Sequence, residues 1–179
     1  MRSIGVGVSL LVVVSACTVA EVETPDPAAV PSGEPVAMGA DPTGPVTELG
    51  SGTMLDVGWR YVIYESAEGW CTELQLVEVT TTGCGPTIVP EEGAHFGSVS
   101  ADEPLESGVT PVYGIVSGEI FTVWVIDEVA GRIPATLLPL DEAGLEGQGF
   151  MVLMPAGATP THLQALARSG EVLETYELP

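Results

Sequence analysis

The alternation of apolar and polar positions divides the chain into three parts. An apolar run fills residues 4–14, a stretch with no regular apolar period follows to residue 50, and short apolar runs divided by glycine turns fill the remainder. Short runs of this kind favour β-strands, and no long stretch combines the apolar period of a helix with capping residues. The pattern predicts a folded domain over residues 51–179, preceded by two segments, 1–16 and 17–50, with other roles.

Eight runs in the last part of the chain have the composition of strands. They are residues 59–66, 71–80, 112–116, 120–127, 132–140, 149–155, 161–168 and 171–178. Two prolines place the run 132–140 at a sheet edge or make it irregular, and the run 149–155 is apolar enough for a buried strand. Short strands with regular turn signals predict an all-β domain, an antiparallel β-sandwich (Ig-like or similar) of about seven or eight strands.

Two short segments are the best candidates for helices. They are residues 139–146 and 161–168, and Gly144 weakens the first of them. The pattern leaves the second segment open between a strand and a short helix.

The charge of the chain is strongly negative and excludes several classes of partner. The 179 residues include 25 Asp and Glu against four basic residues, for a formal net charge of −21. Such a surface repels nucleic acid and anionic lipid, so we expect no nucleic-acid partner. The acids occur as pairs and singles without the spacing of a calcium loop, which favours a solvated acidic surface and no metal site.

The first 17 residues have the order of an export signal. Arg2 precedes the apolar run, which is too short to cross a membrane as a helix, and small residues follow it. The four residues Val14-Ser15-Ala16-Cys17 resemble the lipobox of bacterial lipoproteins. That resemblance implies a signal peptide over 1–16 and a Cys17 that carries acyl chains such as palmitate. The alternative is ordinary signal cleavage after Ala20.

Residues 17–50 have the composition of a disordered segment. This stretch is rich in Pro, Gly and acids and holds no basic and no aromatic residue, so it cannot bury enough apolar surface to fold. A stiff acidic linker of this kind suits a tether between a lipid anchor and a folded domain. It also fits a disordered tail with no spacer role.

The chain has three cysteines, and their number supports processing of the N-terminus. Modification or removal of Cys17 leaves Cys71 and Cys84, and export permits a disulfide between them. A metal or redox pair is the alternative, although the spacing is not that of C-x-x-C and no second pair stands nearby.

Motifs for catalysis or cofactor binding are absent from the sequence. His95 and His162 are the only histidines, and His95 lies in a glycine-rich stretch, 93–97, that we expect to be a loop. No nucleophile elbow, zinc-binding helix or phosphate loop accompanies either histidine. The three tryptophans, Trp59, Trp70 and Trp124, suit a core better than a ligand-stacking face. We therefore predict no catalytic residue, no metal and no cofactor.

These features together predict a lipid-anchored protein on the extracytoplasmic face of a bacterial cell membrane. We expect a non-catalytic binding or interaction module of the cell envelope, with a protein or glycan partner that the sequence does not identify. One alternative is a hydrolase of envelope polymers that uses carboxylates and His95. The other alternative is a purely structural envelope component.

Overall fold

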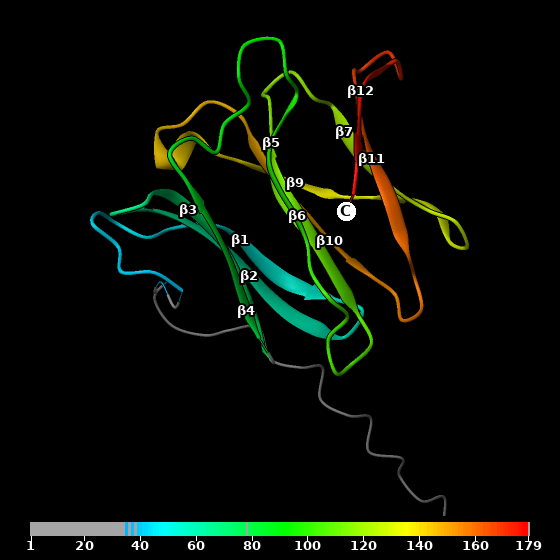
Figure 1. Cartoon of the computed structure of the whole chain (residues 1–179), viewed down its shortest axis with the longest axis horizontal. Coiled ribbons are helices and arrows are strands. Elements are labelled where there is room, and N and C mark those ends of the chain that lie inside the picture. The colour runs from blue at the N-terminus through cyan, green and yellow to red at the C-terminus, as the bar shows by residue number, and fades with distance from the viewer. Residues whose placement is uncertain (1–34, 36, 38, 78, 179) are drawn as a thin grey trace, which may run out of the picture.

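The structure is a computed structural model that describes residues 35, 37, 39–77 and 79–178. The described part of the chain is almost entirely β-structure, with twelve strands and one 3-10 turn (Figure 1). The expected signal segment, Cys17 and most of the expected linker lie outside the described residues. The predicted antiparallel all-β sandwich is confirmed, but the described residues form twelve strands where about seven or eight were expected.

The strands form three antiparallel sheets of four strands each. Sheet A has the order β1 (Thr47–Met54), β2 (Val57–Ser66), β3 (Gly69–Leu76) and β4 (Thr80–Gly85). Sheet B has the order β5 (Phe96–Ala101), β6 (Thr110–Val116), β10 (Gln148–Met154) and β9 (Thr136–Pro139). Sheet C has the order β12 (Val172–Glu177), β11 (Pro160–Leu166), β7 (Thr122–Asp127) and β8 (Gly131–Pro134).

Sheet B is the middle layer, and strand β10 shows why. Phe150, Val152 and Met154 pack into one core with side chains of sheet C. The alternate residues Met151 and Leu153 pack into a second core with side chains of sheet A. Because successive side chains of a strand point to opposite faces, a strand between two cores must be apolar at nearly every position. The apolar run 149–155 is therefore a strand buried on both faces.

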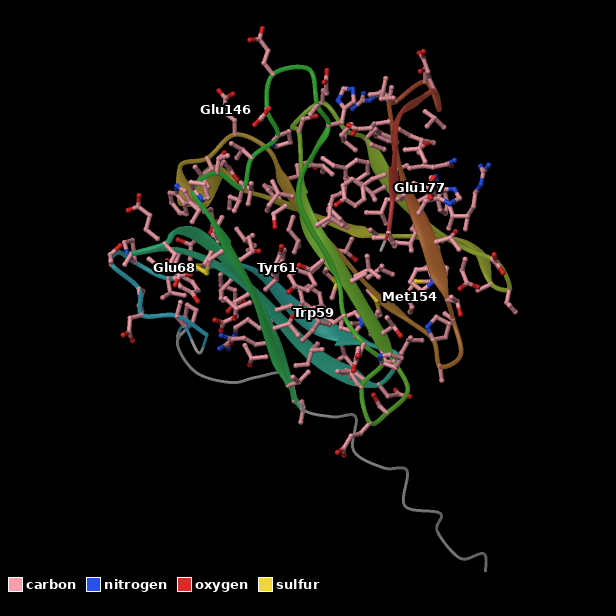
Figure 2. All side chains as sticks on the ribbon, in the orientation of Figure 1. Trp59, Tyr61, Glu68, Glu146, Met154 and Glu177 are labelled. Carbon is pink, nitrogen blue, oxygen red and sulfur yellow. A yellow bond between two sulfur atoms is a disulfide. The ribbon has the colours of Figure 1, made fainter. Side chains whose placement is uncertain are left out.

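The core between sheets A and B is rich in aromatic side chains. Trp59 and Tyr61 of β2 lie between the two sheets (Figure 2). The ring of Tyr61 meets that of Tyr113 edge to face. Trp70 packs beside a separate small cluster at the end of this core. Trp124 lies in β7 between the core residues Val123 and Val125, so it takes the opposite face of sheet C. The three tryptophans therefore share no common face.

The run 132–140 is two strands in different sheets. β8 is the edge strand of sheet C and β9 is the edge strand of sheet B. Ala135 joins them and donates its N–H to the carbonyl of Val123 at 2.9 Å. Pro134 and Pro139 lie at the ends of these edge strands, where a missing N–H is tolerated. The prediction of an irregular edge run is confirmed, and the irregularity is a change of sheet.

Both helix candidates are wrong. Residues 161–168 belong mainly to β11, in which Leu163 and Ala165 point into the core and Gln164 between them points to the opposite face. Residues 139–146 contain a single 3-10 turn, η1 (Asp141–Ala143), which ends at Gly144 with a φ of 72°. A left-handed residue of this kind stops a helix, and glycine adopts it without strain.

A strap of residues 39–46 crosses from the end of β2 to the outer face of sheet A. Thr43 donates its N–H to the carbonyl of Glu65 at 2.8 Å, and Gly39 donates to the carboxylate of the buried Glu73 at 2.9 Å. A side chain at position 39 would collide with Thr82, so the close approach requires glycine. β1 follows directly from Thr47, and the folded part therefore includes residues before position 51.

Cys71 and Cys84 form a disulfide. The two residues face each other across strands β3 and β4, with their Cα atoms 4.1 Å apart. Cys71 is fully buried and packs with Val62 and Tyr64 on the face of sheet A that the strap covers. The predicted pair is confirmed as a structural bridge within one hairpin.

Candidate functional site

The candidate site is a groove at the end of the molecule where three loops meet. Two adjoining depressions of about 550 Å³ and about 360 Å³ share five lining residues, Ser117, Gly118, Glu119, Leu145 and Glu146. The walls come from the β4–β5 loop (86–95), the β6–β7 loop (117–121) and the segment around η1 (139–147). We call this feature the loop groove. Its size lies in the range of small-ligand and side-chain pockets.

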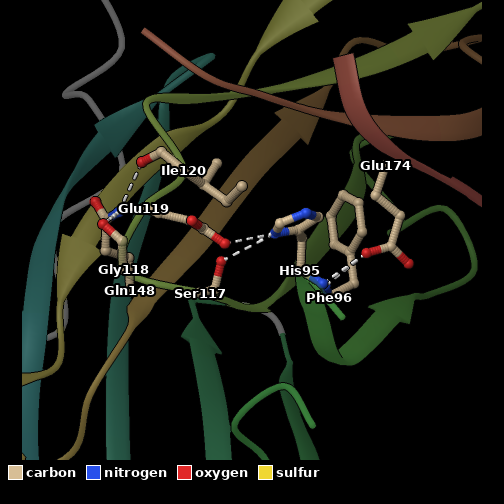
Figure 3. Close-up of polar contacts among 8 residues, drawn as sticks. All are labelled: His95, Phe96, Ser117, Gly118, Glu119, Ile120, Gln148 and Glu174. Atoms are coloured by element: carbon tan, nitrogen blue, oxygen red, sulfur yellow. Dashed lines mark hydrogen bonds and ion pairs between the residues drawn. The ribbon is translucent and has the colours of Figure 1, made fainter. Parts of the chain in front are cut away.

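Backbone hydrogen bonds and one side chain position the walls of the loop groove. Ser117 donates its N–H to the carbonyl of His95 at 2.9 Å, which joins the first two walls. Gln148, at the start of β10, donates its side-chain N–H to the carbonyl of Ile120 at 2.8 Å (Figure 3). Gly147 has a φ of 123° and lies against the carbonyl of Val116, a position that excludes a side chain.

His95 lies beside the loop groove with two polar neighbours on one ring nitrogen. Its Nδ1 is 3.0 Å from a carboxylate oxygen of Glu119 and 3.4 Å from the hydroxyl of Ser117 (Figure 3). The side chain of Glu119 is 66% exposed, so this contact is a solvated pair. Exposed pairs of this kind contribute little to stability.

The loop that carries His95 is tied to sheet C by a carboxylate. Glu174 of β12 accepts the backbone N–H of His95 at 2.6 Å and that of Phe96 at 3.3 Å (Figure 3). Phe96 also packs against Tyr176, two residues along the same strand. The start of β5 is thereby held against the edge of sheet C.

The geometry around His95 does not build a nucleophile. A catalytic triad needs a hydroxyl on one imidazole nitrogen and a carboxylate on the other, so that the ring can take a proton from the hydroxyl. Here Ser117 and Glu119 both face Nδ1. The carboxylate therefore competes with the hydroxyl for the same ring atom and does not orient the ring for it.

Two carboxyl groups with clearly shifted pKa values lie outside the loop groove. Burial raises the pKa of Asp102, and the nearby Thr81 hydroxyl offsets part of that rise. The N–H of Ala130, with those of Val129 and Thr159, lowers the pKa of Asp127 against the opposing effect of desolvation. Neither carboxyl lines the depressions, so these shifted pKa values do not bear on the chemistry of the loop groove.

The lining of the loop groove combines apolar side chains with acids. The apolar part consists of Val89, Pro90, Ala94, Pro139, Leu140 and Leu145. Glu91, Glu119, Asp141 and Glu146 supply carboxylates, and no Lys or Arg is among the lining residues. Figure 2 shows Glu146 at the surface. The groove can bind by apolar contact and by attraction of positive charge.

Metal binding and membrane spanning find no support in the described residues. Within residues 35, 37, 39–77 and 79–178, no three His, Cys, Asp or Glu side chains gather in a way that could hold a metal ion. Over the same ranges, no helix has the length and apolar character needed to cross a membrane.

The sequence pointed to His95 but not to its neighbours. Ser117 lies 22 positions away and Glu174 lies 79 positions away, so only the fold brings them to this histidine. The one available signal was Ser117-Gly118, which marks a turn between two expected strands.

Comparison of the chain with protein families, curated proteins and solved structures finds no match. The residues of the loop groove and their geometry therefore carry the functional conclusion.

Proposed function

We propose that this protein is a non-catalytic binding module of the bacterial cell envelope, anchored to the extracytoplasmic face of the membrane through Cys17. The single observation that carries the binding role is the loop groove, a preformed concave site with apolar and acidic lining. His95, the residue best suited to acid–base chemistry there, faces its hydroxyl and carboxylate neighbours through one nitrogen.

The disulfide supports the exported location. Bridges such as Cys71–Cys84 persist in oxidising compartments outside the cytoplasm and are rare inside it. The lipobox-like residues Val14-Ser15-Ala16-Cys17 supply the anchor in this proposal. Two or more acyl chains suffice for stable attachment, so a protein of net charge −21 needs no basic patch to stay at the membrane.

The anchor is tested by mass spectrometry of the mature N-terminus from cells that express the full chain. We expect an N-terminal peptide that begins at Cys17 and carries the mass of a diacylglyceryl group. In the Cys17→Ala variant we expect the protein to leave the membrane fraction. An unmodified N-terminus at Glu21 would overturn the anchor.

The non-catalytic role is tested by hydrolysis assays on purified envelope glycans and peptides. We expect no turnover by the wild-type protein and no difference between it and the double variant His95→Ala/Ser117→Ala. Turnover that the double variant loses, while the melting temperature stays the same, would replace the binding module by a hydrolase.

A further inference from the structure

We propose that the loop groove binds a cationic peptide segment of a partner protein, one in which Lys or Arg residues alternate with apolar residues. This inference rests on the proposed binding function and names the class of partner. Its first support is the negative charge of the groove lining, which holds four carboxylates and no basic residue. Such a site attracts cations and repels anions.

The carboxylates of the loop groove differ from the acids that stabilise the fold. Glu174 and Glu73 are occupied by backbone and side-chain donors of their own chain. By contrast, the carboxylates of the exposed Glu91 and Glu146 make no hydrogen bond or ion pair with any described residue. Their oxygens are available to a ligand without breaking an internal contact.

The apolar part of the lining selects among cations. Leu145 is partly exposed in both depressions, and Pro139 is exposed in the larger one. A metal ion gains nothing from these surfaces, and no metal-holding group exists among the described residues. Lys and Arg side chains fit because their aliphatic stems cover apolar surface while the charged heads reach a carboxylate.

The chain's own charge excludes a second copy of itself as the occupant. Two copies would each bring a net charge of −21, and the stretch 18–50 contains acids but no Lys or Arg. Nucleic acid and anionic lipid are repelled for the same reason. A separate protein with an exposed basic segment has the complementary charge, and its apolar residues match the groove lining.

The test is fluorescence anisotropy with a labelled peptide, Gly-Lys-Leu-Lys-Gly-Arg-Leu-Gly, added to the full chain. Three comparison probes are spermine, the same peptide with Ser in place of Leu, and the same peptide with Glu in place of Lys and Arg. We expect saturable binding of the first peptide, at least about fivefold weaker binding of the Ser peptide and of spermine, and none of the Glu peptide.

A matched pair of variants locates the binding. Glu91→Gln/Glu146→Gln removes two carboxylates from the loop groove, and Glu128→Gln/Glu171→Gln removes two exposed carboxylates outside it. Since an exposed ion pair contributes about 0.2–1 kcal/mol, we expect the first variant to weaken binding about fivefold and the second to leave it within twofold.

Three results would overturn the inference. They are no binding of the cationic peptide, equal weakening by the two double variants, and equal affinity for spermine and the peptide. Each of them leaves the anchor and the absence of hydrolysis untouched, because those are read from the mature N-terminus and from turnover.

Discussion

Some of the acids in this molecule stabilise the fold by accepting hydrogen bonds. Asp127 is 3% exposed and accepts the N–H groups of Val129 and Ala130, which closes the turn between β7 and β8, and that of Thr159 in the β10–β11 loop. The fully buried Glu73 accepts from the strap and from Tyr64. A buried carboxylate is tolerated only when donors replace its water, and these acids have them. Part of the acidic composition therefore serves to stabilise the fold.

Replacing Asp127 by Asn should destabilise the fold in a pH-dependent way. Its backbone donors hold the pKa of Asp127 below 3.8 in the folded state, so its ionised form stabilises the fold above pH 3.8. That stabilisation disappears as the pH falls below 3.8 through the folded-state pKa. Urea unfolding should show a lower midpoint for Asp127→Asn at pH 7, and the gap to the wild type should narrow in more acidic buffer.

Asp102→Asn is the control for that experiment, because the pKa of Asp102 is shifted in the opposite direction. Burial raises the pKa of Asp102, so its ionisation opposes folding at pH 7. The amide variant should be at least as stable as the wild type at that pH. A gap between Asp127→Asn and the wild type that stays constant with pH would contradict the assigned role of the carboxylate.

At the scale of elements, the disulfide joins the two strands of one edge hairpin. It links β3 to β4, the outer strand of sheet A, and closes a short loop with a sequence separation of 13. A cross-link over a loop of this size stabilises a protein chiefly by restricting the unfolded chain, by about 2–4 kcal/mol.

The double variant Cys71→Ala/Cys84→Ala should therefore lose about 2–4 kcal/mol of unfolding free energy. Chemical denaturation of the oxidised wild type, the reduced wild type and the double variant measures this loss. Reduction should lower the stability of the wild type to near that of the variant and should not change the variant. Equal stability of the oxidised and reduced wild type would rule out a stabilising bridge.

Strands could be predicted from the sequence where side-chain alternation or apolar content is strong. β10 and β2 are examples, since side chains on both faces of each strand are buried. β1 and β5 lacked that signal, because Gly50 and Gly52 interrupt the first and Ser98 and Ser100 the second. Their positions depend on pairing with β2 and β6. Local composition does not record such long-range pairing.

The loop groove could not be predicted for a related reason. Its walls come from three loops that the sheets bring together, and its carboxylates resemble every other acid in the sequence. His95 was recognisable as a loop residue because glycines flank it. The sequence did not reveal that Ser117 and Glu119 share its Nδ1, because that contact depends on the fold.

At the scale of the whole molecule, three layers must hold together against a net charge of −21. Folding brings these like charges closer than they are in the unfolded chain, so repulsion lowers the stability of the compact state. The two apolar cores on either side of sheet B oppose that repulsion. Salt reduces the repulsion without altering the cores.

Raising sodium chloride from 10 mM to 150 mM should therefore raise the melting temperature, by a few degrees at most. The screening length falls from about 30 Å to about 8 Å over that range. Differential scanning calorimetry measures the shift. The rise should be smaller in Glu128→Gln/Glu171→Gln, which carries two fewer negative charges, and a melting temperature that falls with salt would contradict the prediction.

The change of sheet at Ala135 affects the local unfolding of sheets B and C. One short stretch of chain supplies the last strand of sheet C and then the last strand of sheet B, with a single residue between them. Because one residue connects the two edge strands, a displacement of β8 also displaces β9. Sheets B and C therefore have no flexible linker at this border. We expect slow hydrogen exchange to spread over β8 and β9 as one unit. Sheets B and C should therefore open together at this border.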